Sequence, residues 1–160
     1  MQRFACSILL VAAACGGGSD ASVEGDFTIA LTNRDNGCEL TNWVVGEQAS
    51  NIPVVIVQAE SEVTATVNGG AGVVLDLALG SRVYTGAVDG NDLLLELFGT
   101  RGQQRGNCSF TFNSNIDASV SGDTLTGRIE YRAATNANPD CAALEGCVSF
   151  QEFNGTRPPQ

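Results

Sequence analysis

The side chains that could do chemistry in this 160-residue chain are carboxylates, arginines and cysteines, because the sequence contains no histidine. A histidine base, a histidine metal ligand and a histidine pH switch are therefore excluded. No serine has a histidine or lysine partner that could activate it. Assigning a carboxylate pair such as Asp76 and Glu96 to glycoside hydrolysis would be arbitrary, since the sequence does not place them across a cleft. We predict no catalytic residue and no enzymatic activity.

The six cysteines have a spacing that favours disulfides over metal binding. A zinc site of four thiolates would require paired C-x₂-C knuckles, which the sequence lacks, so we predict no metal and no cofactor. Two cysteines lie near the N-terminus, and the other four allow three connectivities. Closeness in sequence favours a Cys141–Cys147 bridge around a short helical turn. That choice leaves Cys38 to pair with Cys108.

The charge of the chain limits its electrostatic partners. Eighteen acidic residues against eight basic ones give a formal net charge of -10. Such a chain repels polyanions, so we predict no nucleic acid partner and no electrostatic attraction to anionic lipid. Strong acidity in a domain of this size mainly favours solubility.

Residues 1–14 have the pattern of an export leader. One positive residue, Arg3, precedes an apolar run from Ile8 to Ala14, which is too short to span a bilayer. A secretory address implies an oxidising compartment, in keeping with the predicted disulfides.

The end of this leader, Ala12-Ala13-Ala14-Cys15, resembles the lipobox of bacterial lipoproteins. The resemblance implies that residues 1–14 are a signal peptide and that Cys15 becomes the lipidated N-terminus. Residues 15–24 would then form a Gly- and Ser-rich tether to the membrane. The address implied is the cell envelope, at the outer membrane, and the alternative is an ordinary secretory leader that is cut nearby.

Residues 108–131 predict one long β-hairpin, because apolar and polar side chains alternate strictly along both arms. Glycine at Gly122-Asp123 supplies the positive φ that a two-residue II′ turn requires. This turn places Val120 opposite Leu125 and Ile116 opposite Ile129. Turn chemistry and the apolar face therefore select the same register.

Similar alternation predicts further strands elsewhere in the chain, bounded by Gly, Asn and Asp. Residues 71–79 are ambiguous: a loop over 69–71 would make them a strand opposite 63–67, but the same run fits a short helix. The single tryptophan, Trp43, is predicted to close one end of the core with its N–H bonded to a backbone carbonyl, or else to stack on a ligand. The remaining predicted strands cover 25–32, 53–59, 63–67, a hairpin at Gly90-Asn91, and 148–153.

These patterns predict an all-β domain over residues 25–154, followed by a disordered tail at 155–160. We expect about eight antiparallel strands, closed as an up-and-down barrel or a barrel-like sandwich. Gly25-Asp26-Phe27 resembles the G-x-W of the lipocalin family at its first strand, with Phe in place of Trp. The resemblance implies a meander barrel that can hold a ligand. The chain also resembles small envelope lipoproteins of Gram-negative bacteria.

Small residues on the inward faces raise the question of a ligand cavity. In a barrel of eight strands, small side chains either interlock with larger ones or leave room for a ligand. Two functions follow: a binding module for a small hydrophobic ligand, or a filled barrel that presents acidic loops to an envelope protein. The residues predicted to line a ligand site are Val67, Gly86, Leu95, Ala118, Gly127 and Ile129.

Overall fold

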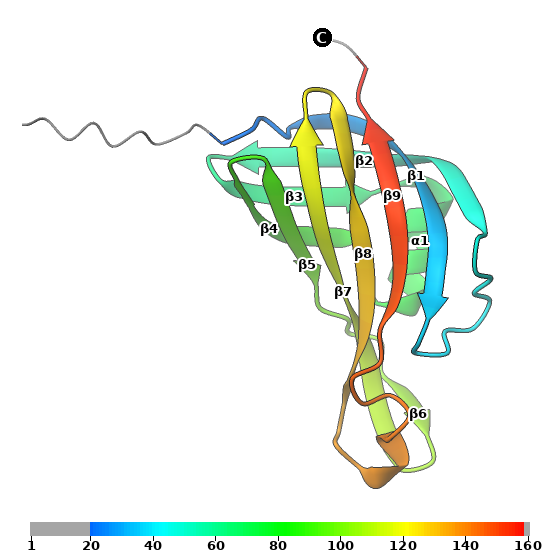
Figure 1. Ribbon diagram of the computed structural model, residues 1–160. Coiled ribbons are helices and arrows are strands. Elements are labelled where there is room, and N and C mark those ends of the chain that lie inside the picture. The colour runs from blue at the N-terminus through cyan, green and yellow to red at the C-terminus, as the bar shows by residue number, and fades with distance from the viewer. Residues whose placement is uncertain (1–19, 159–160) are drawn as a thin grey trace, which may run out of the picture.

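The computed structural model describes residues 20–158, which fold into a single antiparallel β-barrel (Figure 1). The prediction of an all-β meander is confirmed. The elements in chain order are β1 (Gly25–Asn36), β2 (Gln48–Ala59), β3 (Glu62–Val67), α1 (Gly69–Ala78), β4 (Val83–Asp89), β5 (Asp92–Leu97), β6 (Gln103–Arg105), β7 (Cys108–Ser121), β8 (Thr124–Thr135), the 3₁₀ turn η1 (Pro139–Cys141) and β9 (Ser149–Thr156).

The strands follow an up-and-down order and close on themselves. The sheet runs β5-β4-β3-β2-β1-β9-β8-β7-β6, and an additional β5–β7 pairing joins its two sides. Eight strands therefore form the barrel, while β6 pairs only with the first part of β7 and lies outside the ring. Closure removes the free edges of the eight-stranded ring, which an open sheet of this length would expose.

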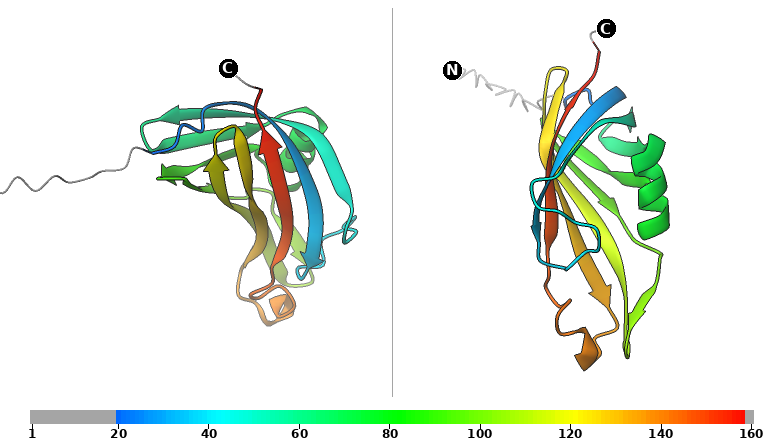
Figure 2. Two further views of the ribbon diagram at one scale, coloured as in Figure 1. Left: turned by 45° about the horizontal axis from the view of Figure 1, so that its top comes forward. Right: turned by 90° about the vertical axis from the view of Figure 1, so that its right-hand side faces the viewer.

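The β7–β8 hairpin has the predicted register. Val120 pairs with Leu125 and Ile116 with Ile129, and Gly122 takes the positive φ of 58° that the turn requires. Both strands run beyond the barrel wall, so their far ends and β6 form a projection (Figure 2). The long hairpin thus forms part of the barrel and carries a separate extension.

Residues 71–79 do not form the predicted strand, and the alternative of a helix is correct. Strand β3 pairs with β2 on one side and β4 on the other, so no edge remains for residues 71–79 to join. Ala71, Leu75 and Leu79 face the core side at a spacing of four, while Val73 and Leu77 are exposed. Residues four apart share one face in a strand and also in a helix. Ala71, Leu75 and Leu79 therefore fit the alternation of a strand as well as the face of a helix.

One end of the barrel is closed by hairpin turns and by residues 20–24. Val23 is fully buried there, and Val88, Leu93 and Val120, which adjoin the β4–β5 and β7–β8 turns, are buried as well. The amide of Gln58 holds this segment, accepting from the Val23 backbone N–H at 2.8 Å and donating to the Ala21 carbonyl at 3.3 Å. We call this the closed end.

The opposite end carries the long connections and both disulfides. The predicted pairing of Cys141 with Cys147 and of Cys38 with Cys108 is wrong, because the bridges are Cys38–Cys147 and Cys108–Cys141. Strand register accounts for the observed pairs. Asn36 pairs with Ser149, which brings the residues just outside β1 and β9 together.

The second bridge follows from the β7–β8 pairing in the same way. Phe110 lies opposite Thr135, so the chain that follows Thr135 passes beside Cys108. Asp140 then accepts from the backbone and side-chain amides of Asn107, both at 3.0 Å. The predicted disulfide-bracketed helical turn is not found. Only the short 3₁₀ turn η1 forms there, and Cys141 and Cys147 bond to Cys108 at the start of β7 and to Cys38 just after β1, not to each other. At the C-terminus, β9 extends to Thr156, into the predicted tail.

Candidate ligand-binding cavity

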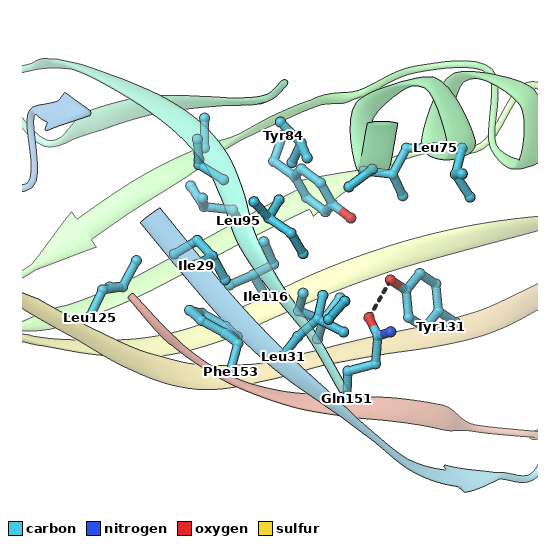
Figure 3. Close-up of a pocket in the computed structure, with 18 of the residues that line it drawn as sticks. Ile29, Leu31, Leu75, Tyr84, Leu95, Ile116, Leu125, Tyr131, Gln151 and Phe153 are labelled. Carbon is cyan, nitrogen blue, oxygen red and sulfur yellow. Dashed lines mark hydrogen bonds between the residues drawn. The ribbon is translucent and has the colours of Figure 1, made fainter. Parts of the chain in front are cut away.

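The barrel interior contains a cavity of about 450 Å³ (Figure 3). Aliphatic and aromatic side chains from the strands and from α1 make up most of its wall. Leu93, Leu125 and Phe153 line it on the side of the closed end, since β5 and β8 begin there and β9 ends there. The interior is therefore an apolar chamber.

The cavity opens at the end that carries the long connections. Glu47, Gln48 and Ala49, at the start of β2, form one part of its rim. Helix α1 forms another, with Ala71, Val74 and Leu75. Val74 is 62% exposed, so the rim itself presents apolar surface to solvent. We call this end the mouth.

Three of the six residues predicted to line a ligand site do so: Val67, Leu95 and Ile129. Gly86, Ala118 and Gly127 are not among the residues that line this cavity. A Cβ at Gly127 would lie 2.6 Å from the Ala118 Cβ, and one at Gly86 would collide with the Leu94 carbonyl. These small residues let neighbouring strands approach closely; they do not make room for a ligand.

Four large side chains of the barrel, Leu93, Tyr131, Phe110 and Phe112, divide into two groups. Leu93 and Tyr131 line the cavity, whereas Phe110 and Phe112 pack on each other with ring centroids 5.5 Å apart. Both phenylalanines lie in the first part of β7, toward the projection. Because the two rings pack against each other in the extended part of the hairpin, they do not occupy the barrel centre.

Tyr84 places a phenol in the cavity wall. Its hydroxyl forms a hydrogen bond of 3.0 Å with Ser114 Oγ, and both residues are buried. Burial raises the pKa of Tyr84 to about 12, while the bond to Ser114 lowers it slightly against that trend. The group is therefore neutral near pH 7 and serves as a hydrogen-bonding group, not as a charge.

A second polar group lies nearer the mouth. Tyr131 donates to Gln151 Oε1 at 2.9 Å, and Gln151 Nε2 donates to Asn33 Oδ1 at 2.7 Å (Figure 3 shows the first bond). Burial raises the pKa of Tyr131 well above its ordinary value. Part of its ring remains accessible toward the cavity that it lines.

Trp43, which is half-buried, packs beside this group, and its N–H bonds to a backbone carbonyl as predicted. Its Nε1 donates to the Arg34 carbonyl at 2.8 Å, and its ring meets Tyr131 edge to face with centroids 5.9 Å apart. Trp43 is not among the residues that line the cavity; it contacts the cavity wall through Tyr131.

Several lining residues were missed by the sequence reasoning, although two of them carried a signal. Asn33 continues the inward alternation of Ile29 and Leu31, but the predicted strand ended at Thr32 because turn-forming residues follow. Gln151 shares the inward face of β9 with Phe153. A polar residue in register with an apolar face is the pattern that would have identified both.

The described residues contain no arrangement suited to metal binding. Nowhere in residues 20–158 do three His, Cys, Asp or Glu side chains gather closely enough to hold an ion. The same part of the chain has no helix of the length and hydrophobicity needed to cross a bilayer. Cys15 lies outside the described residues, so its predicted lipidation stays a prediction.

No family model, curated protein or solved structure matches this chain.

Proposed function

We propose that this protein is a non-enzymatic binding module that holds a small hydrophobic ligand inside its barrel. The observation that carries this proposal is the apolar cavity of about 450 Å³, open at one end. Ligand pockets in proteins commonly measure roughly 300–1,000 Å³ and combine apolar walls with a few polar groups. A barrel whose only task was to present its outer surface would gain stability from filling this space.

The positions of the two ends support a ligand that enters through the mouth. The closed end is filled by Val23, Val88 and Leu93, and none of these is more than 1% exposed. At the mouth, by contrast, the wall is formed by helix α1 and by the start of β2. An entrance at this end would place the apolar part of a ligand deep in the cavity and leave its polar part near the rim.

We also propose that Cys15 anchors the protein in the cell envelope, at the outer membrane. Asp20, the first described residue, accepts from Gly90 N–H at 3.0 Å and so lies at the closed end. Five residues of extended chain reach at most about 18 Å, less than half of the roughly 40 Å that a twelve-residue strand such as β1 spans. An anchor at Cys15 would thus hold the closed end toward the membrane and leave the mouth accessible from the aqueous side.

Titration with N-phenyl-1-naphthylamine, an uncharged probe that fluoresces in apolar surroundings, tests ligand binding. We expect saturable binding to the wild-type protein. Ala65→Phe should abolish it, because Ala65 is a buried residue of the cavity wall and the larger ring would occupy the chamber. Ala87→Phe is the matched control, since Ala87 is exposed on the outer face of β4.

Binding that is absent, or that Ala65→Phe and Ala87→Phe affect equally, would contradict the proposal. The better interpretation would then be an interaction lipoprotein that presents its acidic outer surface to another envelope protein. Anchoring has a separate test: Cys15→Ser should move the protein from the membrane fraction to the soluble fraction. A wild-type protein that is already soluble would show that Cys15 is not lipidated.

A further inference from the structure

The cavity wall offers no positive charge to a ligand. None of the arginines within residues 20–158 lines it, and the chain has no lysine. The arginines instead meet carboxylates on the outside: Arg34 pairs with Glu152 at 2.6 Å, and Arg82, which packs near α1, pairs with Asp76 at 2.9 Å. The only carboxylate on the wall, Glu47, lies at the rim. An anionic head group would therefore meet a negative charge and no counter-charge.

Burying a carboxylate under these conditions is unfavourable. An ionised group that leaves water without a partner loses its hydration, and the low polarity of the surroundings strengthens any repulsion. Tyr84 and Tyr131 cannot offset this cost with charge, because both phenols are neutral near pH 7. The same wall accepts an uncharged chain with no such penalty.

One nitrogen of the polar group near the mouth, Asn33 Nδ2, has no hydrogen-bond partner within residues 20–158. The hydrogen bonds run from the Tyr131 hydroxyl to Gln151 and from the Gln151 amide to Asn33 Oδ1. Asn33 Nδ2 donates to nothing within residues 20–158, yet no buried side-chain nitrogen or oxygen in that range lacks a partner. The Asn33 amide nitrogen is therefore accessible, and the cavity is the space that Asn33 lines.

The backbone holds Asn33 firmly in this position. Its N–H donates to the Glu47 carbonyl at 2.9 Å, and its carbonyl accepts from Gly46 N–H at 2.8 Å. A donor fixed at the rim of an apolar chamber suits an oxygen at the end of an apolar chain. A hydroxyl, an ester carbonyl or an amide carbonyl could each accept from it.

We infer that the ligand is an uncharged amphiphile, whose apolar chain occupies the chamber and whose oxygen accepts a hydrogen bond from Asn33 Nδ2. This inference rests on the proposed binding function and narrows it to one chemical class. Fatty acids and other anionic lipids of equal chain length are poor ligands. Neutral alcohols, esters and amides are good ones.

Competition against bound N-phenyl-1-naphthylamine tests the ligand class on the wild-type protein. The competitors are methyl dodecanoate, dodecan-1-ol and dodecanoic acid, used at about pH 8, where the acid is ionised. We expect the ester and the alcohol to displace the probe at concentrations at least roughly tenfold lower than the acid. An acid that competes as well as its ester would overturn the inference and leave the binding function intact. Absence of probe binding would overturn both.

Asn33→Asp tests the hydrogen bond itself. The substitution keeps an oxygen that accepts from Gln151 and removes the donor Asn33 Nδ2. We expect competition by the ester and the alcohol, measured relative to each variant's own affinity for the probe, to weaken about fivefold. Asn154→Asp, on the exposed face of β9, is the control and should leave this competition unchanged. Equal competition in Asn33→Asp and Asn154→Asp would show that Asn33 does not contact the ligand.

Discussion

The closed end and the mouth of the barrel are built by different means. At the closed end the connections are short turns, such as those at Gly90 and Gly122, and the interior is filled by Val23, Val88 and Leu93. At the mouth the connections are long, a helix replaces a hairpin, and two disulfides join segments that strands do not pair. Local sequence is sufficient for the first arrangement. The second depends on covalent links.

This difference explains how one barrel can be both stable and hollow. Burial at the closed end supplies packing, while the bridges constrain the mouth without filling it. A ligand cavity requires that side chains leave the barrel centre unfilled, and the packing contacts missing there lower the stability of the fold. The disulfides offset that loss at the end where it occurs.

Removing the Cys38–Cys147 bridge should have the largest effect on stability. This bridge joins residues 109 apart in sequence, so the chain-entropy model assigns it about 4.8 kcal/mol. We expect Cys38→Ser combined with Cys147→Ser to lower the free energy of unfolding by roughly that amount in urea titrations. Unchanged stability would mean that strand pairing alone holds the mouth together.

The Cys108–Cys141 bridge should contribute less. It joins residues 33 apart, which corresponds to about 3.7 kcal/mol in the same model. Replacing both cysteines by serine should free η1 from the start of β7 and leave the cavity wall in place, since neither cysteine lines it. Peptide mapping of the wild-type protein without reduction checks both bridges. A Cys141–Cys147 cross-link would contradict the structure.

The same substitution at each end separates packing at the closed end from packing at the mouth. Val23 is 0% exposed and Val74 is 62% exposed. Val23→Ala should therefore cost about 2 kcal/mol through lost burial and the cavity left behind. Val74→Ala should change stability by less than about 0.5 kcal/mol, because alanine favours the helix and little surface is lost. Similar costs for the two variants would refute the contrast between the ends.

The chain contains two tyrosines, Tyr84 and Tyr131, and the pKa of each reports how far water enters the barrel interior. Both have a pKa raised by burial, in Tyr84 to about 12 from 10.0. Their neutral forms stabilise the fold fully below pH 10. That contribution falls as the pH rises from 10 toward the raised values, by at most about 1.4 kcal/mol per pH unit for each phenol.

Ultraviolet absorbance of the phenolate measures this directly. We expect no tyrosine to ionise in the folded protein near pH 10. Tyr131→Phe leaves Tyr84 as the single reporter and assigns any transition that remains. A midpoint near pH 10 from Tyr131 would indicate that the mouth admits bulk water, which would weaken the case for an apolar ligand.

The sequence by itself determined the meander of hairpins. Alternation with a period of two, interrupted by glycine at Gly90 and Gly122, acts over a few residues, so the local pattern predicted the register of β7 and β8. The absence of histidine and the acidic charge also follow from composition alone. The inward position of Tyr131 was predictable for the same local reason.

Only the tertiary structure decided the disulfide partners, the state of residues 69–78 and the existence of the cavity. Cys38 meets Cys147 because β1 pairs with β9, and residues so distant in sequence carry no local mark of that pairing. Residues 69–78 are helical because β4 already occupies the edge of β3. The cavity exists because Phe110 and Phe112 lie in the extension of β7 and so do not occupy the barrel centre. Each of these outcomes depends on which segments become neighbours, and that depends on closing the whole barrel.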